Sequence, residues 1–145
     1  MTFGIYALSL QERLNAMLDL NHLFENIICF QAKETSDEDA KEYGYASWID
    51  YCHKRNFASR FVRDCPICGK PFTSENYAVG GHVLAALSKD KDGNPALDTE
   101  CITPICNRCN FRADKLRFFN VKRIYLTKTP PKPKTLGSKK TKSPF

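Results

Sequence analysis

The chain has 145 residues, a net charge of +6 and a hydrophobic fraction of 42%, with 10 Phe, 6 Tyr and one Trp. This length corresponds to about one domain, and the apolar content fits a globular protein with a sizeable core. No apolar run approaches the ~18 residues of a membrane-spanning helix, and no charged start followed by an apolar stretch resembles a signal peptide. These features argue against membrane and secreted proteins, so we expect an intracellular protein.

Residues 1–58 are predicted to be helical. Ser9 followed by Glu12 matches a capping box, in which the serine accepts an orphan amide proton and the glutamate reaches back to the cap. Ser36 is expected to cap a second helix, although Gly44 weakens its early turns. We interpret both helices as core and scaffold, with a surface for a protein partner as the alternative. Apolar residues recur at helical spacing as Leu10, Leu14, Met17, Leu18, Leu23, Phe24, Ile27 and Ile28, and later as Ala40, Tyr43, Trp48, Ile49 and Cys52.

Residues 59–126 alternate short apolar stretches with turn signals. Residues 61–63 are expected to form a short strand, and residues 77–84 a second strand or a hairpin around Gly80 and Gly81. The Asp-Gly and Asn-Pro pairs within 88–95 predict a turn. Further elements are predicted as a short apolar segment over 102–105, a helix over 107–118, and a final strand or extended segment over 121–126.

Residues 127–145 are expected to be a flexible tail rich in Lys and Pro. The three prolines at positions 130, 131 and 133 favour extended, polyproline-like backbone. The tail carries no acid, and this charge asymmetry indicates a polyanionic partner. A solvated end without a specific role is the equal alternative. Its lysines are Lys128, Lys132, Lys134, Lys139, Lys140 and Lys142.

Four of the seven cysteines form two Cys-x-x-Cys pairs, Cys65 with Cys68 and Cys106 with Cys109. An odd number of cysteines is atypical of a secreted disulfide framework. Each loop directs two sulfurs towards one point, and two such loops can close a tetrahedral Cys₄ zinc site. We therefore predict structural zinc, with reduced core cysteines as the alternative. The remaining cysteines include Cys29 and Cys52, which are interpreted as small buried apolar residues, and Cys101.

His82 follows two glycines, which allow the backbone to bend and to approach another group closely. A neutral imidazole at this position can take a proton from water. The other interpretations of His82 are a zinc ligand or a hydrogen-bonded core histidine, and position alone favours these.

The order of these motifs resembles that of the zinc-containing HNH endonucleases, which have the ββα-metal fold. The matching segments are 65–69 (CPICG), 80–83 (GGHV) and 102–110 (ITPICNRCN), and the resemblance covers about residues 62–118. It implies an α+β protein in which a small zinc-stabilised ββα-metal module, residues 59–126, follows the helical region 1–58 and precedes the tail. In this family two Cys-x-x-Cys loops clamp a hairpin and a helix around structural zinc.

The resemblance also implies a nuclease site. His82 matches the general base that activates water, and Asn110 matches the residue that holds a divalent ion, Mg²⁺ or Mn²⁺, at the scissile phosphate. The reaction would be phosphodiester hydrolysis in nucleic acid, with DNA as the first expectation. Positive side chains on or near the predicted helix would hold phosphates, or would simply form a solvated face: Arg108, Arg112, Lys115 and Arg117.

Three positions depart from the family pattern. Gly81 stands where the family often has an acidic residue or histidine, Cys101 where many members have asparagine, and Asn110 where the family name has its final histidine. These departures leave open a non-catalytic zinc module that binds nucleic acid or a protein, and a small adaptor that binds through its N-terminal helices. Three acidic residues near in sequence are candidates for an additional oxygen ligand: Asp98, Glu100 and Asp114.

Overall fold

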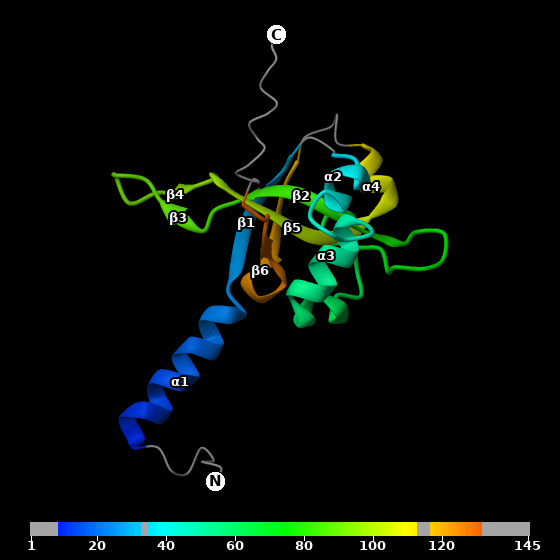
Figure 1. Ribbon diagram of the computed structural model, residues 1–145. Helices are drawn as coiled ribbons and strands as arrows, with labels where there is room; N and C mark the ends of the chain where they lie inside the picture. The colour runs from blue at the N-terminus through cyan, green and yellow to red at the C-terminus, as the bar shows by residue number, and fades with distance from the viewer. Residues whose placement is uncertain (1–8, 33–34, 113–116, 132–145) are drawn as a thin grey trace.

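The computed structural model describes residues 9–32, 35–112 and 117–131, which form an α+β fold (Figure 1). The helices are α1 (Leu10–Leu23), α2 (Asp37–Lys41), α3 (Trp48–Arg55) and α4 (Asn107–Phe111), with 3₁₀ helices η2 (Phe57–Phe61) and η3 (Arg123–Tyr125). The strands are β1 (Asn26–Gln31), β2 (Ala78–Ala85), β3 (Ser88–Lys89), β4 (Pro95–Ala96), β5 (Thr99–Cys106), β6 (Phe118–Lys122) and β7 (Thr127–Lys128). The predicted α+β class is confirmed. Within the described ranges, no helix combines the length and the apolar character needed to cross a bilayer.

Five strands form one antiparallel sheet in the order β6-β1-β2-β5-β7. The central strand β2 and its neighbour β5 pair along their whole length, from Ala78 opposite Cys106 to Ala85 opposite Thr99. Beyond this hairpin, β3 and β4 form a separate two-stranded ribbon whose turn has Gly93 at a φ of 85°. The turn predicted within residues 88–95 is therefore confirmed.

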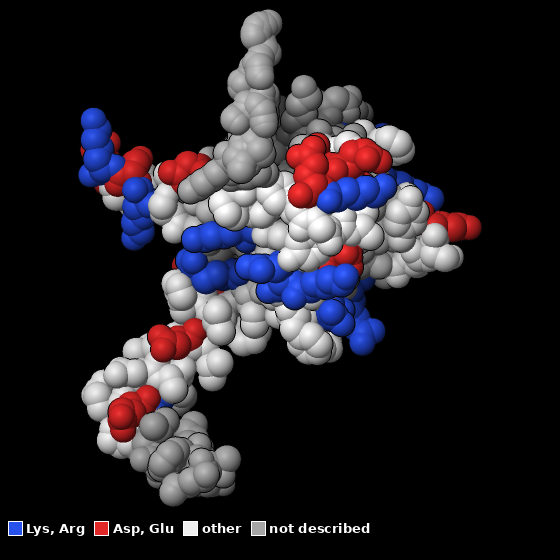
Figure 2. All heavy atoms as spheres, in the orientation of Figure 1, with Lys and Arg blue, Asp and Glu red and all other residues white. Residues whose placement is uncertain are grey.

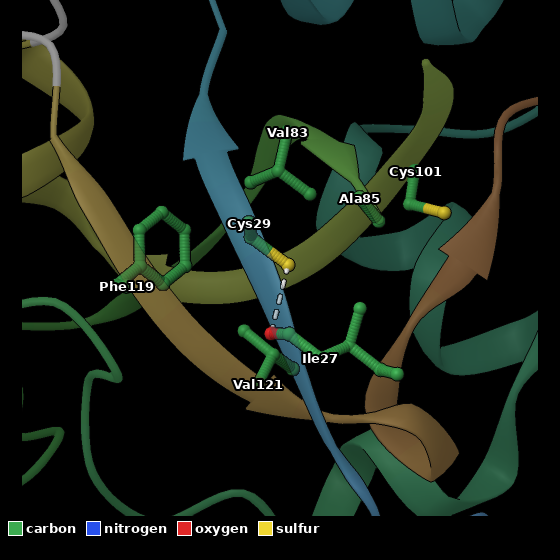
Figure 3. Close-up of a cluster of buried hydrophobic side chains, with 7 residues drawn as sticks. All are labelled: Ile27, Cys29, Val83, Ala85, Cys101, Phe119 and Val121. Carbon is green, nitrogen blue, oxygen red and sulfur yellow. Dashed lines mark hydrogen bonds between the residues drawn. The ribbon is translucent and has the colours of Figure 1, made fainter. Parts of the chain in front are cut away.

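Side chains along a strand alternate between the two faces of the sheet, so every second residue shares a face. On one face these residues are apolar and form a core. Figure 3 shows Cys29 at the centre of this core, with its Sγ 3.6 Å from the carbonyl oxygen of Ile27. Burial raises the pKa of Cys29 to about 12 and that of Cys101 to about 11, so both thiols stay protonated at neutral pH. The cluster consists of Ile27, Cys29, Val83, Ala85, Cys101, Phe119 and Val121.

The opposite face of β2 and β5 is covered by α3, whose buried residues Trp48, Tyr51 and Cys52 pack with Ile102 of β5. The burial of Cys29 and Cys52 agrees with their interpretation as apolar residues. The first turn of α3 lies directly on Gly80, where a Cβ atom would come within 2.5 Å of the carbonyl carbon of Trp48. Glycine at this position therefore permits the close approach of helix and strand.

We expect Gly80→Ala to lower the free energy of unfolding by about 1–3 kcal/mol, the usual cost of overpacking. The added methyl group meets helix backbone, which cannot rotate away. Gly81→Ala is the comparison, because its methyl group meets the side chain of Ile105 instead of backbone. Adding Ile105→Val to Gly81→Ala shortens that side chain, so the double variant should recover part of the stability that Gly81→Ala loses. Chemical denaturation measures all three variants. A Gly80→Ala protein as stable as the parent would contradict the close packing of α3 on β2.

The helical interpretation of residues 1–58 is wrong for Asn26–Gln31, which form β1. The spacing of Ile27 and Ile28 fits a helix, but burial alternates along this segment, and it pairs with β2 on one side and β6 on the other. Tertiary pairing therefore overrides the local pattern. As a result, the regions 1–58 and 59–126 share one sheet.

The second predicted helix is divided into α2 and α3. Ser36 caps α2 as expected, and Ser47 caps α3 by accepting the N–H of Asp50. Between them, Gly44 adopts a φ of 88°, a left-handed conformation that ends the helical path.

The capping box at the start of α1 is confirmed, because the Oγ of Ser9 accepts the N–H of Glu12 and the Ser9 N–H donates to the Glu12 carboxylate. The scaffold interpretation is wrong for this helix, since none of its residues is buried and it extends away from the sheet (Figure 1). The leucines of α1 are exposed. The protein partner expected at the N-terminal helices stays a prediction.

Residues 77–84 were expected as a second strand or a hairpin, and the strand is confirmed, because β2 runs continuously through the glycine pair. Three other predictions within residues 59–126 need correction. Residues 61–63 are the end of η2 and an extended link rather than a strand. The helix predicted over 107–118 ends at Phe111, and Phe118 already belongs to β6. The final segment 121–126 is the end of β6 followed by η3. The flexible tail predicted over 127–145 is wrong for Thr127–Lys128, which form β7 paired with β5. Residues 132–145 lie outside the described ranges.

Candidate functional site: a cysteine cluster beside a polar groove

The first cysteine loop is a tight turn held by backbone hydrogen bonds. The N–H of Cys65 donates to the carbonyl of Lys70 at 2.9 Å, and the N–H of Gly69 donates to the carbonyl of Cys65 at 2.7 Å. Gly69 has a φ of 77°, which a side chain would strain. The turn thus brings Cys65 and Cys68 to one side of the loop.

The second cysteine loop lies where β5 passes into α4. Cys106 is the last residue of the strand and the N-cap of the helix, and its Sγ accepts the N–H of Cys109 at 3.4 Å. The N–H of Cys106 donates in turn to the Sγ of Cys65 at 3.4 Å. The end of the β2–β5 hairpin is therefore joined to the first loop.

The four sulfurs of Cys65, Cys68, Cys106 and Cys109 all lie within 4.8 Å of one another. Cys68 and Cys106 are separated by 3.8 Å between sulfurs, close to the ~3.8 Å expected for a tetrahedron with Zn–S distances of about 2.3 Å. Soft thiolate ligands in this number favour zinc. The cluster can bind a metal ion such as Zn²⁺, and the predicted convergence of the four cysteines is confirmed.

Without a cation, the buried thiols of Cys65 and Cys109 resist ionisation. Burial raises the pKa of Cys65, and it raises that of Cys109 to about 12. Burial also opposes ionisation of the exposed Cys68, but the backbone of Lys70 and the neighbouring thiols donate hydrogen bonds that lower its pKa. Metal binding must therefore release protons from this cluster.

Two polar side chains connect the cluster to the sheet. The buried Gln31 of β1 donates from Nε2 to the carbonyl of Cys109 at 2.7 Å. Arg117 donates to the Sγ of Cys109 at 3.8 Å, where its positive charge would stabilise a thiolate. Arg117 was predicted to bind phosphate, and this geometry favours a role at the sulfur cluster instead.

A groove of about 220 Å³ lies between the start of β2, α4 and the segment that enters α2. Asp37, Asn107 and Asn110 line it. The Oδ1 of Asn107 is buried without a hydrogen-bond partner among the described residues. Carboxylate and amide oxygens are ligands that Mg²⁺ accepts. The full lining is Thr35, Ser36, Asp37, Tyr77, Val79, Gly80, Asn107, Asn110 and Phe111.

His82 lies on the face of β2 that α3 covers. Its Nδ1 is 2.8 Å from the Oγ1 of Thr35, and the Trp48 ring packs edge-on with 4.8 Å between centroids. Burial lowers the pKa of His82, against the opposing charges of Glu100 and Asp39, so its imidazole is neutral at pH 7. His82 does not line the groove itself, but Thr35 does, and this threonine connects the imidazole to the groove.

The remaining residues predicted to bind phosphate or a metal ion do not gather at one place. Arg108 and Arg112 are exposed on and directly after α4, beside the groove-lining Asn110. Asp98 accepts a hydrogen bond from Ser88 at 2.7 Å, and neither it nor Glu100 lines the groove. Asp114 and Lys115 lie outside the described residues.

Sequence reasoning did not assign Thr35, Asp37 or Asn107 to the site. Thr35 and Asp37 flank Ser36, which was recognised solely as a helix cap, and Asn107 lies between the cysteines of the second loop. An asparagine inside a metal-binding loop is a weak signal, and no local pattern links residues 35–37 to the second loop.

Comparison of the chain with protein-family models, with curated proteins and with solved structures finds no match. The functional conclusion therefore depends on the geometry of the chain itself.

Proposed function

We propose that the protein is a metal-dependent endonuclease of the HNH type, which hydrolyses phosphodiester bonds in nucleic acid, with DNA as the first substrate. The observation that carries the proposal is the convergence of the four cysteine sulfurs at the end of the β2–β5 hairpin, directly before α4. The first cysteine loop, the β2–β5 hairpin and the second cysteine loop with α4 follow one another in the order that the family resemblance implies.

Two metal positions would have separate roles. Four thiolates fill a tetrahedral site and leave no position open for water, so zinc at the cysteine cluster is structural. The groove beside it offers oxygen atoms from Asp37, Asn107 and Asn110, which suit Mg²⁺ or Mn²⁺. A divalent ion there would stabilise the negative charge that develops on the phosphate.

His82 supplies the general base in this proposal. A tautomer that donates its Nδ1 proton to Thr35 leaves Nε2 as the proton acceptor for water. The resulting hydroxide attacks phosphorus in line, and the leaving oxygen departs on the opposite side. Arg108 and Arg112 hold the neighbouring phosphates without selecting a sequence.

Cleavage of plasmid DNA by the zinc-loaded protein with added Mg²⁺ or Mn²⁺ tests the proposal. His82→Ala is expected to lower the rate by roughly 10²–10⁴-fold, the range for loss of a general base, while zinc content stays unchanged. His53→Ala is the matched control, because His53 of α3 is hydrogen-bonded to Ser59 of η2 and does not line the groove. Equal rates in the parent and His82→Ala proteins would remove His82 from the mechanism.

The second candidate is a zinc module that binds nucleic acid or a protein without cleaving it. The observation in its favour is the position of His82, whose ring lies against Trp48 and Thr35 rather than in the groove wall. For this function, intact protein shifts labelled DNA in a salt-sensitive manner, and no product appears with either divalent ion.

A further inference from the structure

A second surface lies at the C-terminal end of α3 and along η2. Within residues 53–63 the sequence has four cations, Lys54, Arg55, Arg60 and Arg63, and no acid, and all four are exposed. The same segment presents two phenyl rings to solvent, Phe57 at 66% and Phe61 at 58% exposed. Two exposed aromatic rings among four exposed positive charges are typical of an interaction surface rather than of a solvated helix end.

This surface is held in a defined shape. The rings of Phe57 and Phe61 meet edge to face with 5.3 Å between centroids, and the Arg60 guanidinium lies 5.3 Å from the Phe57 centroid. Arg60 also donates from Nε to the carbonyl of His53 at 3.2 Å. Asn56 caps η2 and donates to the carbonyl of Ile124 at 2.9 Å, which ties the surface to η3. A rigid arrangement of this kind costs little conformational entropy on binding.

Positive charge continues from this surface onto the sheet edge. The hydroxyl of Tyr51 on α3 donates to the carbonyl of Lys128 in β7 at 2.7 Å, so the basic end of the sequence begins next to α3. Figure 2 shows Lys and Arg side chains gathered in a band across this face of the molecule. Lys54 is paired with Asp50 at 3.4 Å, which leaves the arginines as the main phosphate ligands.

A hollow of about 400 Å³ adjoins Phe61 and separates η2 from the first cysteine loop. Its walls include Arg60, Arg63 and Phe72, and Asp64 is the one acidic residue among them. This volume lies within the roughly 300–1,000 Å³ of small-ligand sites, so it can accept an unstacked base. The carboxylate of Asp64 can accept a hydrogen bond from the amino group of such a base.

We propose that the surface formed by Phe57, Phe61, Arg55, Arg60 and Arg63 binds single-stranded nucleic acid, with bases stacked on the phenyl rings and phosphates held by the arginines. Stacking on exposed rings requires bases that are not already stacked in a duplex. A duplex ligand would use the arginines and leave the rings without a role. The positive charge of the three arginines complements a polyphosphate strand. This inference does not depend on cleavage at the groove.

Fluorescence anisotropy of the zinc-loaded protein with a labelled 15-nucleotide oligo(dT), without added Mg²⁺, tests the proposal. The double variant Phe57→Ala/Phe61→Ala is expected to bind at least about 30-fold more weakly, because each of two stacked bases usually contributes at least about fivefold. Phe118→Ala is the matched control, because Phe118 is equally exposed at 66% but lies on β6, at the opposite edge of the sheet. Its affinity should stay within about twofold of the parent protein.

A second variant keeps the test valid if the double phenylalanine variant is unstable. Arg55→Gln/Arg63→Gln should reduce the salt dependence of binding by roughly 0.7 in the log–log slope for each phosphate that the variant no longer neutralises. An oligo(rU) of the same length should bind within a few-fold, because stacking and phosphate contacts do not read the sugar. Equal affinity for a matched duplex, or parental binding by both double variants, would overturn the proposal. His82→Ala should lose cleavage and keep this binding, which separates the two functions.

Discussion

Cys106→Ser is expected to abolish tight zinc binding and the cooperative unfolding transition together. Cys106 is 1% exposed, ends strand β5 and caps α4, and its sulfur lies 3.8 Å from that of Cys68. Serine oxygen is a poor ligand for a site built from soft thiolates. Structural zinc contributes roughly 10–16 kcal/mol of folding free energy in small zinc modules, which is comparable to the ~5–15 kcal/mol stability of a whole domain.

The control for this experiment is Cys101→Ala, which changes a buried cysteine of the same strand that lies outside the cluster. This variant should keep its zinc and lose about 1 kcal/mol, the usual effect of a small core truncation. Metal analysis and thermal unfolding, with and without a chelator, measure both quantities. A Cys106→Ser protein with parental zinc content and melting temperature would show that the four sulfurs do not form the stabilising centre.

Trp48→Ala is expected to lower the free energy of unfolding by about 3–5 kcal/mol, the range for removal of a large buried aromatic side chain. Trp48 is the single tryptophan of the chain and is 4% exposed. It packs against Tyr51 and His82 with centroid distances of 5.5 and 4.8 Å, and its Nε1 donates to the carbonyl of Ser36 at 3.1 Å. One side chain therefore holds α3, the start of α2 and the imidazole against the sheet.

Trp48→Phe is the matched control, because it keeps an aromatic ring over His82 but removes the hydrogen bond to Ser36. Its destabilisation should be clearly smaller than that of the alanine variant. In Trp48→Ala, removal of the covering ring should also raise the pKa of His82 towards its ordinary value, since burial is what lowers it. Denaturation and an NMR titration of the histidine measure these effects. An unchanged histidine pKa in the alanine variant would show that Trp48 does not desolvate the imidazole.

The lowered pKa of His82 also sets the direction of a pH effect. Because the folded state binds this proton less readily than the unfolded state, neutral His82 contributes stability above its ordinary pKa of about 6.5. That contribution is lost as the pH falls through the lower folded-state pKa.

Signals contained within a few neighbouring residues were readable from the sequence. Ser9 and Glu12 form the capping box that their spacing indicated, and the turn at Gly93 lies where Asp-Gly predicted it. Both features depend on contacts between residues at most four positions apart. The segment of β1 was misread because its partners, β2 and β6, lie far along the chain.

By itself, the sequence determined the mixed class and the cysteine cluster. The two-residue spacing in each Cys-x-x-Cys loop places its two sulfurs on one side, independently of the rest of the fold. Tertiary structure decided what stands beside that cluster. Packing of α3 on Gly80 brings Thr35 and Asp37 to the groove that Asn110 lines, and it places His82 behind Thr35. Convergence of residues this distant in sequence depends on strand register and helix packing, which no spacing rule within one segment can specify.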